Sequence, residues 1–190
     1  MRLFFAIPLP DPVKDTLCVA IARLREASLK GHFTRRDNLH LTLVFLGETS
    51  SERLGELSQV MNSVTVPPFS LAFSHLERFQ KKERDIWWVG VGPSAALRKV
   101  HRDLSNSLVR FGFKPEDRPY VPHLTLGREI ITVPGFDSEA VSRTIPPLAM
   151  QADRILLMQS GQVNGNLTYT EILQHLLKNP DRTSGSETEW

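Results

Sequence analysis

The sequence predicts one globular domain of mixed helices and strands, built from two similar halves. Helix and strand patterns alternate along the 190 residues without a long linker. Two apolar runs at 69–79 and 85–92 flank a short charged segment, which indicates an antiparallel strand pair. The phrase His-Leu-Thr-Leu occurs twice, at 40–43 and 123–126, and a predicted helix precedes each copy. Because 41% of the residues are hydrophobic, the chain can form one core, or two small lobes that share one.

Local patterns predict the elements of the first half. The apolar run over 2–7 predicts a strand. A helix is predicted over 11–28, with Asp11 as its N-cap, a proline at the first helical position and apolar residues recurring on one face. A strand over 39–47 follows, and the apolar stripe of residues 50–64 predicts a second helix.

The second half is predicted in the same way. Ser94 is the expected N-cap of a third helix over 94–111, and Gly112 is expected to end it. Residues 131–147 are predicted to be a loop. The last residues, 178–190, are polar without apolar periodicity, so we expect a disordered tail after a single domain over 1–177. Three further strands are predicted, at 122–131, 152–160 and 167–177.

Charge and composition narrow the class of protein. The 23 Lys and Arg residues nearly balance the 21 Asp and Glu residues, and the net charge is +2. This balance argues against a bulk nucleic-acid binder, so any contact with nucleic acid is expected to be local. The single cysteine, Cys18, cannot form an internal disulfide, which fits a reducing compartment. No apolar stretch is long enough for a membrane span or a signal-peptide core, so we expect a soluble, cytoplasmic protein.

The two His-Leu-Thr-Leu strands are expected to present the same groups. Successive side chains of a strand point to opposite faces, so His40 and Thr42 share one face, and His123 and Thr125 share one face. If the two halves face each other, these four side chains meet in one cleft. The opposite faces are predicted to pack into the core through Leu39, Leu41, Leu43 and Phe45 in the first copy and Leu124, Leu126 and Ile130 in the second.

Two histidines and two threonines suit an in-line displacement at phosphorus. Near neutral pH one imidazole can act as general base while the other acts as general acid. The threonine hydroxyls can donate hydrogen bonds to the non-bridging oxygens, and this chemistry needs no metal. The four other histidines are expected to be structural: His32, His75, His101 and His175.

These features resemble the RNA 2′,3′-cyclic phosphodiesterases, also called 2′-5′ RNA ligases, of the 2H phosphoesterase superfamily. The family signature is His-x-Thr-x twice, and this chain matches it with HLTL at both sites. The opening MRLFFAIPLP, the lead-in FTRRDNLH, the FLG after the first motif and the PH that opens the second also resemble the family. The resemblance covers about residues 1–177.

The resemblance implies a bilobal α+β fold with a pseudo-two-fold axis, in which antiparallel sheets line a central cleft and helices lie outside. It implies that His40 is the proton donor, that His123 is the proton acceptor, and that Thr42 and Thr125 contact the phosphate oxygens. Family members hydrolyse ribonucleoside 2′,3′-cyclic phosphate ends to 2′-phosphates without a cofactor, and some join or cleave 2′-5′ linkages reversibly. The expected partners are RNA ends or nucleotides with a cyclic phosphate, and the protein is expected to be a monomer.

Arg128 ends the second motif, where the family often has arginine, and a guanidinium fits a bidentate phosphate contact. Strict strand alternation places Arg128 on the face opposite His123. A bulge at Gly127 would redirect it into the cleft, because glycine inside a strand often marks a bulge. The alternative is a solvent-facing arginine at the end of the strand.

Further basic and aromatic residues flank the motifs. Arg35, Arg36 and Arg118 can steer an RNA end at the rim of the cleft, although isolated surface arginines are common. Trp87 and Trp88 are adjacent on a predicted strand, so they are expected to point to opposite faces. One is expected in the core, and the other either packs between the lobes or stacks on a base.

Three alternative functions compete with the phosphodiesterase. A metal-dependent phosphoesterase needs a cluster of His, Asp and Glu ligands, and the HLTL phrases contain no carboxylate, so we expect no metal. A non-catalytic RNA-end-binding module has no need of two intact His-x-Thr motifs. A phosphodiesterase for another cyclic phosphate, such as ADP-ribose 1″,2″-cyclic phosphate, or for a 2′-5′ oligonucleotide would use the same groups, and the sequence does not separate it from the first hypothesis.

Overall fold

Two antiparallel sheets and four helices make up the part of the chain that the computed structural model describes, residues 1–80 and 84–179, with the side chain of Ser74 left out. The strands are β1 (Arg2–Pro8), β2 (Ser28–Phe33), β3 (His40–Glu48), β4 (Phe69–Phe79), β5 (Asp85–Val91), β6 (His123–Thr132), β7 (Leu148–Ala152), β8 (Arg154–Val163) and β9 (Asn166–Leu176). The helices are α1 (Asp11–Glu26), α2 (Leu54–Asn62), α3 (Ala95–Arg110) and α4 (Ser138–Ser142), with short 3-10 turns at Arg36–Asn38 and Ser51–Arg53.

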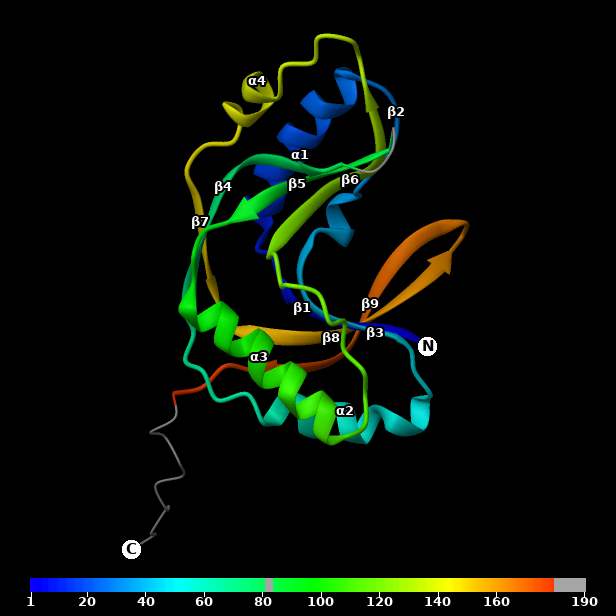
Figure 1. Ribbon diagram of the computed structural model, residues 1–190, viewed down its shortest axis with the longest axis vertical. Helices are drawn as coiled ribbons and strands as arrows, with labels where there is room; N and C mark the ends of the chain where they lie inside the picture. Colours follow the sequence, from blue (N-terminus) through cyan, green and yellow to red (C-terminus); the bar gives the residue numbers. More distant parts are fainter. Residues whose placement is uncertain (81–83, 180–190) are drawn as a thin grey trace, which may run out of the picture.

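The two sheets form the two lobes of the molecule (Figure 1). One sheet has four strands in the order β3-β1-β8-β9, and the other has five in the order β2-β6-β5-β4-β7. Neighbouring strands run antiparallel throughout both sheets. The predicted bilobal α+β fold, with helices outside the sheets, is therefore confirmed.

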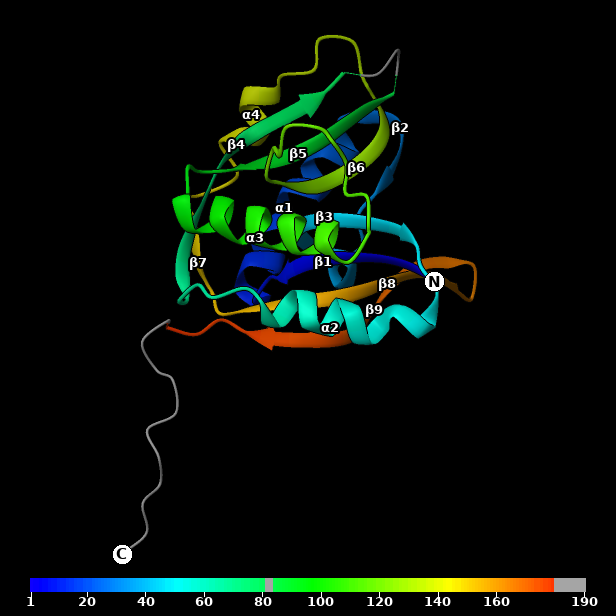
Figure 2. The same cartoon turned by 60° about the horizontal axis from the view of Figure 1, so that its bottom comes forward.

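The helices cross between the lobes. Helix α1 follows β1 of the four-stranded sheet but packs on β2, β6 and β7 of the five-stranded sheet. Helix α3 follows β5 of the five-stranded sheet but packs on β3 and α2 on the side of the other lobe (Figure 2). Each lobe therefore buries a helix supplied by the other, which explains why one hydrophobic core runs through both lobes.

Most predicted elements form within one or two residues of their expected bounds. The N-cap of α3 is confirmed, because the Ser94 side-chain oxygen accepts a hydrogen bond from the Leu97 backbone N–H at 3.2 Å. Gly112 follows α3 with a φ of +76°, a left-handed conformation that glycine adopts readily. The prediction of Asp11 as the N-cap of α1 is wrong. Pro10 takes that position, and Asp11 lies in the first turn, where its carboxylate pairs with Arg36 at 3.0 Å.

Edge strands and a short helix were not predicted. Strand β2 pairs with β6 at one edge of the five-stranded sheet, and its residues alternate between half-buried and exposed without an apolar pattern. The predicted loop over 131–147 contains α4, whose N-cap Asp137 accepts backbone hydrogen bonds from Glu139 and Ala140. Strand β7 forms the other edge of the same sheet.

The predicted core faces of the two motif strands are buried, with one exception. Leu39, Leu41, Leu43, Leu124, Leu126 and Ile130 are all at most 3% exposed. Phe45 was predicted to join them, and that prediction is wrong because its side chain is 45% exposed.

Two further predictions are the disordered C-terminal tail and the absence of a membrane span. Residues 180–190 of the predicted tail lie outside the described residues, so the tail and the domain bounds of 1–177 stay predictions. Within the described ranges, no helix combines the length and the apolar character needed to cross a membrane.

Cys18 is half-buried, and burial raises the pKa of its thiol.

Candidate active site

The two motif strands contact each other where the lobes meet, although β3 belongs to one sheet and β6 to the other. Their first five residues have the same burial pattern: the histidine and the threonine are half-buried, and the residues after each are buried. Each strand therefore has its histidine and threonine on the less buried face, as the motif predicts.

Strand β3 contains a bulge directly after its threonine. Thr42 pairs with Ala6 of β1 and Val44 pairs with Phe5, so Leu43 is an extra residue in β3. Leu43 and Val44 are consequently both buried. The extra residue shifts the alternation of side chains by one position, which brings Phe45 to the cleft face and explains its exposure.

Strand β6 contains a bulge at the equivalent position. Thr125 pairs with Trp88 of β5 and Gly127 pairs with Trp87, so Leu126 is the extra residue. The shift returns Arg128 to the face of His123. Of the two orientations considered from the sequence, this is the one in which a bulge directs Arg128 into the cleft. Arg128 thus occupies the position in the second motif that Phe45 occupies in the first.

Glycine at position 127 avoids two close contacts. A Cβ there would lie 2.9 Å from Cδ1 of Ile130 and 3.2 Å from the His32 carbonyl oxygen, so a valine, as in the first copy, would require both neighbours to shift. Beyond Arg128, Glu129 has a φ of 53°, which is uncommon for a residue with a side chain. A second register shift lies between Gly127 and Ile130, so β6 bends as it leaves the cleft.

His40 is held by contacts on both ring nitrogens. Its Nδ1 donates to the Asn38 backbone carbonyl at 2.7 Å, because a carbonyl only accepts. In this tautomer Nε2 accepts from the Thr42 hydroxyl at 2.9 Å. The rings of Phe4 and Tyr169 flank the imidazole, with centroids 4.9 and 5.1 Å away. Asn38 is itself buried and its amide binds the Leu167 carbonyl on β9, which holds the acceptor in place.

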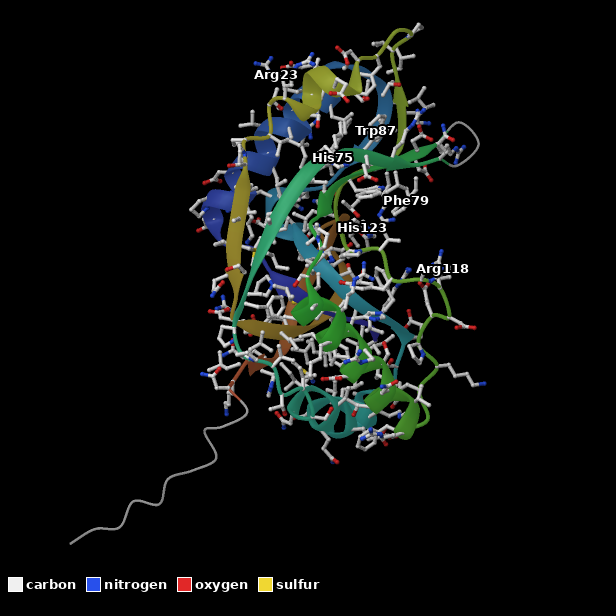
Figure 3. All side chains as sticks on the ribbon, turned by 60° about the vertical axis from the view of Figure 1, so that its left-hand side comes forward. Arg23, His75, Phe79, Trp87, Arg118 and His123 are labelled. Carbon is white, nitrogen blue, oxygen red and sulfur yellow. The ribbon has the colours of Figure 1, made fainter. Side chains whose placement is uncertain are left out.

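His123 is held in the same way. Its Nδ1 donates to the Val121 backbone carbonyl at 2.8 Å, again two residues before the histidine. Phe79 and Trp88 flank the ring, with centroids 5.2 and 5.6 Å away. Figure 3 shows Phe79 and His123 close together on the inner side of the five-stranded sheet. The Nε2 atom has no hydrogen-bond partner within the described part of the chain, and it is the nitrogen left to act on a substrate.

Both imidazoles favour the neutral form in the free protein. Burial lowers the pKa of His40 to about 4, the Asn38 carbonyl opposes this effect, and the positive charges of Arg128 and His123 add to it. Burial also lowers the pKa of His123, and the positive charge of Arg128 lowers it further. The hydrogen bond to the Val121 carbonyl raises this pKa and so opposes both effects. A negative charge in the cleft would act in the opposite direction on both rings.

A central cavity of about 420 Å³ opens beside the two motifs. Its size lies within the range of pockets that hold small molecules. It is lined by Thr42, Leu43, Val44 and Phe45 of β3, His123 and Arg128 of β6, Phe79 and Ile86 of the strand pair, His101 of α3 and residues of the 115–121 segment, among them Arg118, Tyr120 and Val121. Of the four motif side chains only Thr42 and His123 line this cavity. His40 and Thr125 do not line it, and both are half-buried on the strands that do.

The structure distinguishes the candidate arginines. Arg128 forms no ion pair with any described residue, so an uncompensated guanidinium faces the cavity. Arg36 is paired with Asp11 and Asp15 on α1, at 3.0 and 2.7 Å, so it fastens the segment before β3 to that helix. Arg118 lines the cavity and binds Glu116 at 2.8 Å. Arg35 is exposed and does not line the central cavity.

The two tryptophans lie on opposite sides of their strand, and one of the other histidines lines the central cavity. Trp87 packs in the core against Phe136, whereas Trp88 packs on the cleft side between Phe79 and His123, so both are buried and neither presents a free ring face to a base. His101, predicted to be structural, stacks on Tyr120 and lines the central cavity.

Three residues of the site were not predicted: Asn38, Tyr120 and Tyr169. Asn38 orients His40, Tyr169 covers it, and Tyr120 bonds to β3 from the segment before β6. Nothing in their local sequence marks them, because their partners lie far away along the chain. Within residues 1–80 and 84–179, no group of three or more His, Cys, Asp or Glu residues is placed to hold a metal ion.

Comparisons of the sequence and of the structure with known proteins point to the same family. The family model described as the 2′-5′ RNA ligase superfamily matches residues 13–164. The RNA 2′,3′-cyclic phosphodiesterase of Thermotoga maritima is 28% identical over 84% of this chain and 87% of its own length, and that of Escherichia coli K12 is 33% identical over 77% of each. The crystal structure of E. coli LigT complexed with 3′-AMP superposes with a TM-score of 0.78 at 28% identity, covering 94% of this chain and 98% of that one.

The fold and the cleft define a two-lobed phosphoesterase-like protein with one His-x-Thr motif from each lobe. With the family model matched over most of its length, the chain belongs to the 2′-5′ RNA ligase superfamily. The resemblance inferred from the doubled motif is confirmed.

Proposed function

We propose that this chain is an RNA 2′,3′-cyclic phosphodiesterase that hydrolyses a cyclic phosphate end to a 2′-phosphate. The observation that carries the proposal is the pair of histidines from facing strands, each with Nδ1 bonded to the backbone carbonyl two residues earlier. This bond fixes each ring and points Nε2 away from the backbone carbonyl. In His123 the Nε2 atom has no partner in the described ranges, and in His40 it accepts from the Thr42 hydroxyl, which must turn to the phosphate when His40 is protonated. The names of the two relatives and the 3′-AMP bound to E. coli LigT support the same substrate class.

The proposed reaction uses one histidine on each side of the phosphorus. His123 takes a proton from water, and the oxygen attacks phosphorus in line with the bond to the ribose 3′-oxygen. As that bond breaks, His40 gives a proton to the 3′-oxygen. The phosphate stays on the 2′-oxygen. Thr42 and Thr125 donate hydrogen bonds to the non-bridging oxygens.

Arg128 supplies the positive charge for the phosphate. It lines the cavity beside His123 and has no carboxylate partner among the residues described. A guanidinium can bind two phosphate oxygens at once. The negative charge that Arg128 attracts also raises the pKa of His40, which must be protonated to act as the acid.

The same groups can serve a second nucleophile, so we include reversible 2′-5′ ligation in the proposal. A 5′-hydroxyl that takes the place of water at His123 would form a 2′-5′ phosphodiester. Hydrolysis and joining then differ only in the nucleophile.

The test is product identification with adenosine 2′,3′-cyclic phosphate and with an RNA that ends in a cyclic phosphate. Phosphorus NMR and resistance to a 3′-specific phosphatase should show a 2′-phosphate. A 3′-phosphate product would contradict the assigned orientation of the ribose. Binding without turnover would support an RNA-end-binding module, and a strong preference for ADP-ribose 1″,2″-cyclic phosphate would support the alternative substrate.

A further inference from the structure

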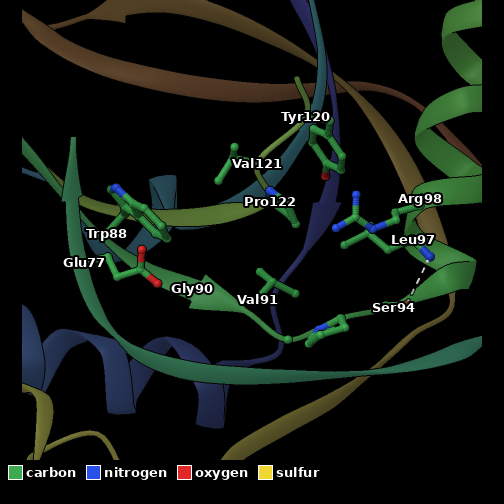
Figure 4. A pocket seen from close by; sticks show the side chains of 12 residues that line it. Glu77, Trp88, Gly90, Val91, Ser94, Leu97, Arg98, Tyr120, Val121 and Pro122 are labelled. Atoms are coloured by element: carbon green, nitrogen blue, oxygen red, sulfur yellow. Dashed lines mark hydrogen bonds between the residues drawn. The ribbon is translucent and has the colours of Figure 1, made fainter. Parts of the chain in front are cut away.

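A second cavity, the side cavity, shares two lining residues with the central one. Figure 4 shows the side chains that line it. Its volume is about 260 Å³. Tyr120 and Val121 line both cavities, so the two meet at this segment. The rest of its lining comes from β4, β5 and the start of α3, including Glu77, Trp88 and Arg98.

The side cavity lies next to His123. Pro122, which precedes His123 in the chain, lines it, and so does Trp88, whose ring centroid is 5.6 Å from that of His123. Strand β3, which carries His40, contributes none of the described lining residues. Neither His40 nor His123 is among the lining residues, and the link of the cavity to the proposed base runs through Pro122 and Trp88.

The two ends of the side cavity carry opposite charges. Figure 4 shows Arg98 on the side of α3 and Glu77 on the opposite side, beside Trp88. Arg98 forms no ion pair with another residue in the described ranges, whereas Glu77 accepts from His75 at 2.9 Å. A ligand that fits this arrangement has a phosphate at one end and hydroxyl or amino hydrogens at the other.

The direction of attack indicates which ligand this is. In-line displacement requires the nucleophile to enter beside the base, on the side of phosphorus opposite the leaving oxygen. With a cyclic phosphate end in the central cavity, the nucleophile enters at His123, where the side cavity lies. Water needs no cavity of this size. A second ribonucleotide does.

We propose that the side cavity binds the ribonucleotide whose 5′-hydroxyl is joined to the cyclic phosphate, with the 3′-phosphate of that nucleotide at Arg98. The inference rests on the proposed function, because it uses the roles of His40 and His123. The cavity is smaller than pockets for drug-sized ligands, which start at about 300 Å³. It therefore accommodates a ribose with its phosphate, and the base reaches towards Glu77 at the edge.

The joining step balances without a further reactant. The 5′-hydroxyl gives its proton to Nε2 of His123 as its oxygen bonds to phosphorus. The bond from phosphorus to the 3′-oxygen breaks, and that oxygen takes a proton from Nε2 of His40. The product is a 2′-5′ phosphodiester with a free 3′-hydroxyl. Cleavage of a 2′-5′ linkage is the same path in reverse, with the departing nucleotide in the side cavity.

The test compares two 2′-5′-linked dinucleotides, ApU and ApU with a 3′-phosphate on the uridine. Wild-type protein should cleave the phosphorylated one with a kcat/KM about tenfold higher, because a charged hydrogen bond holds the extra phosphate. Arg98→Gln should lower this ratio to about one, and Arg98→Lys should keep part of it. Arg102→Gln, on the next turn of α3 and outside the lining, is the matched control and should keep the full ratio.

Hydrolysis of adenosine 2′,3′-cyclic phosphate by the wild-type protein distinguishes failure of the side-cavity inference from failure of the proposed function. If this hydrolysis occurs but neither dinucleotide is cleaved, the side-cavity inference and the ligation part of the proposal are wrong, and the proposed hydrolysis of cyclic phosphates stands. If both dinucleotides are cleaved with a ratio of one, only the side-cavity inference is wrong. An unchanged ratio in a folded Arg98→Gln protein, checked by circular dichroism, would also overturn the inference. Absence of the hydrolysis itself would overturn the proposed function and this inference with it.

Discussion

The Tyr120 hydroxyl donates a hydrogen bond of 3.1 Å to the backbone carbonyl of Thr42, linking the segment before β6 to the motif strand of the other lobe. The half-buried Tyr120 ring stacks on that of His101, with ring centroids 4.0 Å apart. The next residue, Val121, accepts the hydrogen bond from His123. One short segment thus sets the position of both motifs relative to each other.

Removing that hydroxyl should affect turnover more than binding. We expect Tyr120→Phe to lower kcat by about three- to tenfold with a smaller change in KM, because the motifs lose their fixed spacing while the phosphate contacts remain. The free energy of unfolding should fall by about 1 kcal/mol, as for one buried hydrogen bond. Steady-state kinetics and urea denaturation measure the two effects.

Tyr169→Phe is the control for stability, because the Tyr169 hydroxyl has no hydrogen-bond partner in the described ranges. It should leave the free energy of unfolding nearly unchanged. If Tyr120→Phe changed stability but neither kcat nor the pH profile, Tyr120 would be structural and would not position the motifs.

Replacing either histidine should abolish most turnover in a folded protein. Acid and base groups typically contribute about 10² to 10⁴-fold each, so we expect His40→Ala and His123→Ala to lose rate on this scale. The double variant should be little worse than either single one, because the two groups act as a unit. Single-turnover rates with a cyclic nucleotide measure this, and substantial activity in His123→Ala would refute the two-histidine mechanism.

The pH dependence should differ between the free and the substrate-bound protein. Burial lowers the pKa of both histidines, to about 4 for His40, so the bell-shaped profile of kcat/KM should have its maximum on the acidic side of neutrality. Bound phosphate is negative and favours both imidazolium forms, which raises both pKa values, so the profile of kcat should lie at higher pH. A flat profile between about pH 5 and pH 9 would contradict the assignment.

Arg128 should affect both the binding of the substrate phosphate and the pKa of the two histidines. We expect Arg128→Gln to raise KM by about tenfold, because a charge-assisted phosphate contact is lost. The pKa of both histidines should rise, since the guanidinium lowers them in the wild-type protein, and the kcat/KM profile should move to higher pH. Arg35→Gln removes an equal charge outside the central cavity and should change neither quantity.

Activity should survive chelation. The proposed steps use protons, hydroxyl groups and a guanidinium, so prolonged EDTA treatment followed by gel filtration should leave kcat unchanged. Loss of activity that returns with a divalent metal would support the metal-dependent alternative. Assays with and without added Mg²⁺, Mn²⁺ and Zn²⁺ complete this test.

Much of the fold follows from local pattern. The apolar periodicity of α1 and α3 and the apolar runs of β1, β3, β4 and β6 identify these elements to within one or two residues. The helix predicted over 50–64 begins as a 3-10 turn at Ser51–Arg53 and is α-helical only over Leu54–Asn62. Strand β2 was missed because its residues are half-buried or exposed and form no apolar run, and β7 because it has only five residues. Their position at a sheet edge is not the reason, since β3 is also an edge strand and was predicted.

By itself the sequence determined the chemistry available and the strands that hold it. His40, Thr42, His123 and Thr125 share faces because side chains of a strand alternate, a property of the local backbone. The tertiary structure alone decided what surrounds them. Phe45 and Arg128 reach the cleft because Leu43 and Leu126 are extra residues relative to the neighbouring strands. A bulge is a mismatch between two paired strands, so it depends on a partner far away in the chain. Gly127 indicated the bulge in β6 as one of two alternatives, whereas nothing in the first motif marks the bulge at Leu43.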